Sequence, residues 1–89
     1  MEFLVHMEIG LPPEHPEAAA LRAAEAERAG RLRDEGAIVR IWRIPGRTAN
    51  VGIWEAPDAT ALHDLVSSLP LFPWLDVTVT PLARHYLEA

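Results

Sequence analysis

The stretch IVRIWRIPGRTANVGIWE, residues 38–55, decides the fold. Its first part, residues 38–44, is β-branched and aromatic apart from two arginines, a composition typical of a strand. Pro45, Gly46 and Arg47 follow and predict a turn. Residues 49–55 again combine β-branched and aromatic residues. The middle of the chain is therefore predicted to form a β-hairpin.

The sequence before this hairpin predicts one helix and one strand. Residues 17–35 are rich in Ala, Glu, Arg and Leu, contain no proline and are followed by Gly36, a residue type that commonly ends helices. Residues 10–16 hold one glycine and three prolines and predict a loop. Residues 2–9 alternate apolar and polar side chains, the period of a half-buried strand.

The sequence after the hairpin predicts a second helix and a last strand. Asp58 is suited to the N-cap of this helix. Four apolar residues then follow with helical spacing: Leu62, Leu65, Val66 and Leu69. Residues 75–80 alternate as a strand. The order β-α-β-β-α-β predicts a single domain, residues 1–89, with an α+β ferredoxin-like fold. In this fold a four-stranded antiparallel sheet carries two helices on one face.

The other face of such a sheet is left without a helix. The chain has many aromatic side chains for its size, namely Phe3, Trp42, Trp54, Phe72 and Trp74. We expect the uncovered sheet face, or the apolar loop 69–73, to be buried between copies of the chain in a homo-oligomer. The alternative is that all five aromatic side chains pack in one monomeric core.

The composition excludes several classes of function. A net charge of −5 opposes binding to nucleic acid and to anionic membrane surfaces. No apolar run approaches the roughly 20 residues that span a bilayer, and the N-terminus lacks the features of a signal peptide. The chain has no cysteine, and its four histidines have no metal-ligand spacing. We therefore expect a cytoplasmic protein without a metal.

Glu25 is the most informative polar residue of the predicted first helix. At about 100° per residue it lies within roughly 40° of Leu21 and 20° of Leu32, the leucines expected to face the sheet. Burial of its carboxylate would raise the pKa and make it a better proton acceptor near neutral pH. The alternative is an ion pair with Arg28 or Arg22 on a partly solvated face.

Three arginines, Arg40, Arg43 and Arg47, fall within eight positions and predict a site for a small anion. Arg43 shares one strand face with Val39 and Ile41, which we expect to face the core. It would then reach the space between helix and sheet, where a guanidinium can bind a carboxylate through two hydrogen bonds. The alternative is a surface arginine that lies over a tryptophan.

Motifs of nucleophilic or phosphate chemistry are missing from the sequence. There is no glycine-rich phosphate loop and no Gly-x-Ser-x-Gly motif. Asn50 begins the second hairpin strand, where its amide could donate to a substrate carbonyl or simply close the turn. The remaining chemistry is acid–base catalysis by one carboxylate in an apolar pocket with arginines nearby.

Short motifs along the whole chain resemble those of the muconolactone Δ-isomerase family. They are Ile41-Trp42-Arg43, Gly46-Arg47 followed by Ala49-Asn50-Val51, Leu62-His63-Asp64-Leu65, Leu69-Pro70-Leu71-Phe72-Pro73 and Leu82-Ala83-Arg84-His85. The resemblance implies ferredoxin-like subunits in a homodecamer built from dimers, with sites lined by more than one subunit. It also implies a cofactor-free isomerase of the β-ketoadipate pathway of aromatic degradation, which converts muconolactone, a small anionic lactone, to 3-oxoadipate enol-lactone.

The resemblance also implies roles for single residues. Glu25 corresponds to the family's proton-shuttling glutamate. As our own mechanistic hypothesis, we expect Arg22, Arg43 or Arg47 to bind the substrate carboxylate and Asn50 to stabilise the developing enolate oxygen. The remaining pocket residues would be Thr48 together with an apolar wall of Leu71, Phe72 and a tryptophan.

The chain departs from the family pattern at three positions. Arg22 replaces a lysine, Thr48 a tyrosine and Arg40 a histidine. Because of these changes, more than one substrate is compatible with the resemblance. The alternatives are a related isomerase or cyclase, a cofactor-free monooxygenase acting on an aromatic or polyketide-like compound, and a ligand-binding subunit without catalysis.

Overall fold

A computed structural model describes residues 1–88 of the chain; Ala89, the last residue of the predicted domain, lies outside them. In these residues the chain forms strands β1 (Glu2–Ile9), β2 (Ile38–Arg43), β3 (Ala49–Glu55) and β4 (Leu75–Leu82). The helices are α1 (Ala18–Asp34) and α2 (Ala59–Ser67), with two short 3₁₀ helices, η1 (Phe72–Trp74) and η2 (Tyr86–Glu88). All six predicted strands and helices are present.

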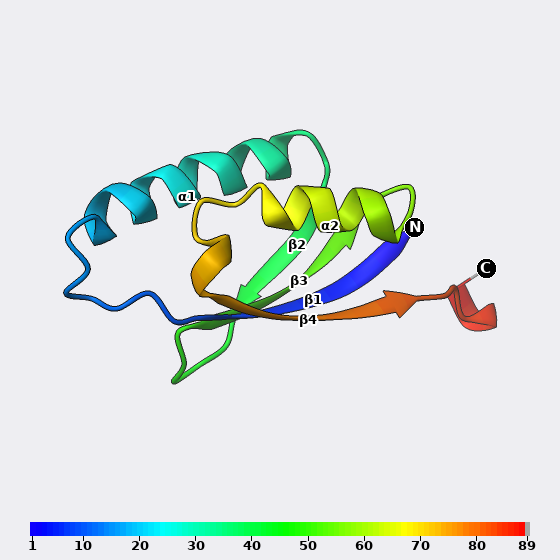
Figure 1. Ribbon diagram of the computed structural model, residues 1–89. Helices are drawn as coiled ribbons and strands as arrows, with labels where there is room; N and C mark the ends of the chain where they lie inside the picture. Colours follow the sequence, from blue (N-terminus) through cyan, green and yellow to red (C-terminus); the bar gives the residue numbers. More distant parts are fainter. Residues whose placement is uncertain (89) are drawn as a thin grey trace.

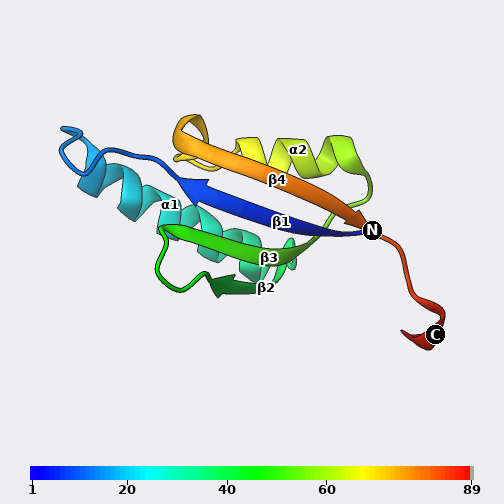
Figure 2. The same ribbon diagram turned by 90° about the horizontal axis from the view of Figure 1, so that it is seen from below.

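The strands form one antiparallel sheet in the order β2-β3-β1-β4. Both α-helices lie on the same face of this sheet (Figure 1). Figure 2 shows α1 toward the β2–β3 side and α2 toward the β4 side. After β4 the chain runs away from the sheet to η2. The predicted ferredoxin-like fold class is confirmed.

Two local signals in the sequence set the helix boundaries as predicted. Gly36 follows the C-cap of α1 and has a φ of +87°, a left-handed conformation that a side chain would disfavour. Asp58 is the N-cap of α2, and its carboxylate accepts a hydrogen bond from the backbone N–H of Ala61 at 2.8 Å. None of the helices within residues 1–88 has the length and hydropathy to cross a membrane.

The core lies between the sheet and the helices. Its most deeply buried side chains are Phe3 and Val5 of β1, Trp54 of β3 and Leu32 of α1. Trp42 belongs to β2 and is 46% exposed, so the five aromatic side chains do not pack in one core. The monomeric-core alternative is therefore wrong.

A β-bulge in β2 decides which of its side chains face the helices. The register with β3 shifts between Ile38 and Arg40, after which Ile41 pairs with Gly52 and Arg43 with Asn50. Gly52 and Asn50 lie two and four residues before the buried Trp54 and share its sheet face, so Ile41 and Arg43 lie on the helix-covered face as predicted. Ile41 is nevertheless 40% exposed and does not belong to the buried core that the prediction assigned to it.

Val39 does not face the core, contrary to the prediction. It falls within the bulge between Ile38 and Arg40 and is 43% exposed. The extra residue breaks the alternation on which the prediction depended, because simple alternation assumes an uninterrupted pairing.

Candidate active site

A cavity of about 430 Å³ lies between α1 and the β2–β3 hairpin. The residues of α1 that line it are Arg22, Glu25, Ala26 and Ala29. The hairpin contributes Ile41, Trp42, Arg43, Thr48, Ala49 and Asn50, and the remaining lining residues are Ile9 and Leu71. A cavity of this size, apolar with a few charged groups, is typical of small-molecule sites.

Glu25 presents a half-buried carboxylate to this cavity. Its Oε1 accepts a hydrogen bond from the backbone N–H of Leu71 at 3.1 Å. Burial raises the pKa of Glu25, because the charged form loses hydration, and the hydrogen bond from Leu71 opposes part of this increase. The carboxylate is therefore held in place and is a stronger base than an exposed one.

The ion pair proposed as the alternative for Glu25 is not formed. Arg28 instead donates from Nε and Nη2 to the Ser68 hydroxyl oxygen, at 3.1 and 3.0 Å. Within residues 1–88, Glu25 also makes no ion pair with Arg22, although both line the cavity. Arg28 thus ties α1 to the end of α2, and the carboxylate of Glu25 is left beside the cavity.

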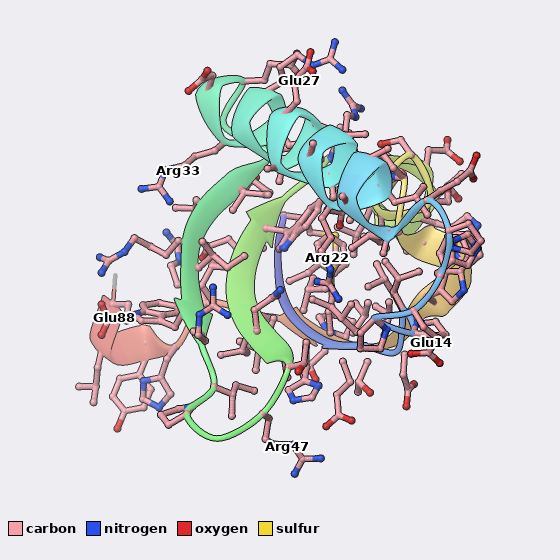
Figure 3. The ribbon with its side chains drawn as sticks, turned by 90° about the vertical axis from the view of Figure 1, so that its left-hand side faces the viewer. Glu14, Arg22, Glu27, Arg33, Arg47 and Glu88 are labelled. Atoms are coloured by element: carbon pink, nitrogen blue, oxygen red, sulfur yellow. The ribbon has the colours of Figure 1, made fainter. Side chains whose placement is uncertain are left out.

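Two arginines from opposite sides line the same cavity as Glu25. Arg22 extends from α1 into the space between this helix and the sheet, whereas Glu27 lies on the far side of the helix (Figure 3). Arg43 comes from the end of β2. No carboxylate in the described part of the chain forms an ion pair with either arginine. The pair is therefore available to bind an anionic ligand.

Arg47 and Phe72 do not line the cavity, unlike the six other predicted site residues. Arg47 extends from the β2–β3 turn away from α1 (Figure 3), and its Nη2 lies 2.6 Å from Oε1 of Glu8. Phe72 packs against the hydrophobic core and makes an edge-on contact with His63. Its neighbour Leu71 faces the cavity instead, because consecutive side chains of the η1 turn point in different directions.

Sequence reasoning missed several small and apolar residues of the cavity. Ala26 and Ala29 line it along α1, and Ala49 lines it on β3. One signal was present, because Ala29 lies one helical turn after Glu25 and therefore on the same face of α1. Over residues 1–88, no three histidine, aspartate or glutamate side chains gather in a way that would hold a metal ion.

The fold and the cavity together define a class: a small ferredoxin-like domain equipped for proton transfer on an anionic ligand. Comparisons with known proteins identify a family within this class. Residues 1–88 match the muconolactone delta-isomerase family. The chain belongs to that family.

Named relatives match this chain in sequence over nearly its whole length. Muconolactone delta-isomerase of Pseudomonas aeruginosa is 41% identical over 87 residues, which cover 96% of this chain and 91% of the relative. The enzyme of the same name from Cupriavidus pinatubonensis is 40% identical, with 96% and 95% covered. A crystal structure of muconolactone isomerase at 3.3 Å resolution superposes with a TM-score of 0.89 at 43% identity, covering 97% of this chain and 92% of that one.

Proposed function

We propose that this chain is a muconolactone Δ-isomerase that moves a ring C=C bond by a 1,3-proton shift, with Glu25 as the only base. The observation that carries the proposal is the half-buried Glu25 carboxylate, held by the Leu71 N–H beside a cavity with two arginines. The family membership of residues 1–88 supports the same activity.

In the proposed reaction, Glu25 removes the ring proton on the carbon next to the C=C bond. The electrons of the broken C–H bond form a new C=C bond, and the conjugated electrons move onto the lactone carbonyl oxygen as a dienolate. The protonated Glu25 then returns the proton to the carbon beside the carbonyl, and the carbonyl re-forms. Atoms and charge balance, since the proton only changes carbon and Glu25 ends as it began.

The two arginines of the cavity would hold the substrate. Arg22 and Arg43 would bind the carboxylate of the substrate's carboxymethyl arm, because both line the cavity. Asn50 would donate to the developing enolate oxygen, where a fixed donor lowers the barrier most. Thr48 and Leu71 would complete the wall. Arg47 and Phe72 are left out of this set, because neither lines the cavity.

The test is Glu25→Gln, assayed by the ultraviolet absorbance change of lactone isomerisation. General-base catalysis contributes about 10²–10⁴-fold, so turnover should fall by at least about a hundredfold. Glutamine keeps an oxygen that can accept the Leu71 N–H, so folding should persist. The matched control is Glu27→Gln, on the opposite side of α1 (Figure 3), which should retain full activity. Comparable turnover in the two variants would remove Glu25 from the mechanism.

We also propose that the chain works in the cytoplasm as a homo-oligomer, a decamer built from dimers, whose subunits cover the sheet face without helices. That face and the tail after β4 expose apolar side chains, among them Trp42, Tyr86 and Leu87. Ile53, next to Arg40 in the β2–β3 register, lies on the same face. In Ile53→Glu the new carboxylate can pair with Arg40, so each subunit should fold while the assembly dissociates in sedimentation analysis.

A further inference from the structure

The turn between β2 and β3 forms the rim of the cavity. Residues Ile44 to Arg47 make a type II turn, in which the Arg47 N–H donates to the Ile44 carbonyl oxygen at 3.3 Å and Gly46 has a φ of +77°. Thr48 follows directly and lines the cavity. The Ile9 N–H donates to the Thr48 carbonyl oxygen at 2.9 Å, so the rim is joined to the end of β1.

The side chain of Arg47 makes a second connection to β1, on the side away from the cavity. Its Nη2 lies 2.6 Å from Oε1 of Glu8. Glu8 pairs directly with Asp76 in the β1–β4 register, which places two negative charges side by side. Arg47 offsets this repulsion. The ion pair thus favours the turn position that allows the hydrogen bond between Ile9 and Thr48.

We infer that Arg47 is a positioning residue, which acts through Glu8 to anchor the β2–β3 turn and thereby places Thr48 and Asn50 in the cavity. The inference rests on the proposed function for its kinetic consequence. It separates the three arginines that were predicted to bind the substrate carboxylate: Arg22 and Arg43 line the cavity, and Arg47 holds its rim.

The kinetic test compares Arg47→Gln, Glu8→Gln and the charge exchange Glu8→Arg/Arg47→Glu. If Arg47 anchors the turn, both single variants raise the KM for muconolactone by about two- to fivefold, the size expected when one exposed ion pair is lost. The exchange should restore KM to near the wild-type value, since the pair is re-formed with its charges reversed. Arg33→Gln, which removes another exposed charge, on α1 (Figure 3), should leave KM unchanged.

Direct binding of substrate by Arg47 predicts the opposite pattern. Glu8→Gln would then free the guanidinium, and KM would stay unchanged or fall. The charge exchange would remain at least as impaired as Arg47→Gln, because it puts a carboxylate where the substrate carboxylate should bind. Either result would overturn the inference.

A measurement without turnover separates this inference from the proposed function. Hydrogen exchange of residues 44–50, followed by mass spectrometry, should be faster in Arg47→Gln and in Glu8→Gln than in Arg33→Gln. It should return to the wild-type rate in the charge exchange. Unchanged exchange in the single variants would overturn the anchoring even if the lactone is turned over. Failure of wild-type turnover would instead count against the proposed function.

Discussion

The carboxylate of Glu25 is joined to the backbone N–H of Leu71, 46 positions later in the chain, by a hydrogen bond of 3.1 Å. This bond ties α1 to the segment that enters η1. It occupies Oε1 and fixes the orientation of the carboxylate, which leaves Oε2 as the oxygen proposed to exchange a proton with the substrate. Burial still outweighs the bond, so the pKa of Glu25 is raised from 4.5.

The pH dependence of catalysis should follow this raised pKa. Glu25 must be ionised to accept a proton, so kcat/KM should increase with pH through a single step whose midpoint lies above 4.5, the ordinary pKa of the group. Steady-state rates from about pH 4 to about pH 8 would show the step. A midpoint at or below 4.5, or a rate independent of pH, would contradict the role of Glu25 as the base.

The same pKa shift should appear in folding stability. Between the ordinary pKa of Glu25 and its raised value, the folded state binds more protons than the unfolded state, so stability falls as pH rises through that window. Glu25→Gln removes this loss, and its free energy of unfolding relative to wild type should increase from about pH 4 to about pH 7.

Urea unfolding at one fixed protein concentration would measure the difference, since the stability of an oligomer depends on concentration. Glu27→Gln serves as the control for the loss of one negative charge. A Glu25→Gln variant that loses stability relative to wild type as pH rises would show that the carboxylate is stabilised, rather than desolvated, in the fold.

The fold was predictable because its signals are local. The hairpin turn at Pro45 and Gly46, the N-cap at Asp58 and the helix end at Gly36 each depend on a few neighbouring residues, and all are found where expected. The bulge at Val39 was not predictable, since an extra residue in one strand becomes apparent only when the partner strand is known.

The candidate site was predictable in part. Helical spacing alone placed Glu25 toward the sheet, and strand alternation placed Arg43 between helix and sheet. The remainder depends on contacts between distant parts of the chain. The pairing of Arg47 with Glu8 joins a turn to β1. Which of Leu71 and Phe72 faces the cavity depends on how η1 packs. Neither this packing nor the Arg47–Glu8 pair leaves a periodic pattern in the sequence.

Removal of either cavity arginine should weaken substrate binding. Hydrogen bonds to charged groups contribute about 1.5–3 kcal/mol, so Arg22→Ala and Arg43→Ala should each lower kcat/KM by roughly 10- to 100-fold, mainly through KM. Arg22→Lys should lose less, because it keeps the charge but not the planar pair of donors. Steady-state kinetics with muconolactone would measure these effects.

The control for both arginine variants is Arg33→Ala, an exposed position on α1 outside the cavity lining. It removes the same charge from the chain, so it reports any effect of net charge on association with an anion. If Arg22→Ala and Arg43→Ala perform as well as this control, the substrate carboxylate is bound elsewhere.

Gly52 supports the cavity wall from the strand beside it, and we expect Gly52→Ala to damage both stability and activity. A Cβ at this position would lie 2.7 Å from the Arg40 carbonyl oxygen, so β2 would have to move, and Ile41 with it. The expected cost is about 1–3 kcal/mol, seen as a lower Tm, with a matching loss of kcat/KM.

Gly30→Ala is the control, because its Cβ would meet nothing within 4 Å and alanine favours the exposed helix by about 0.5–1 kcal/mol. Equal tolerance of the two substitutions would mean that β2 can shift without disturbing the cavity.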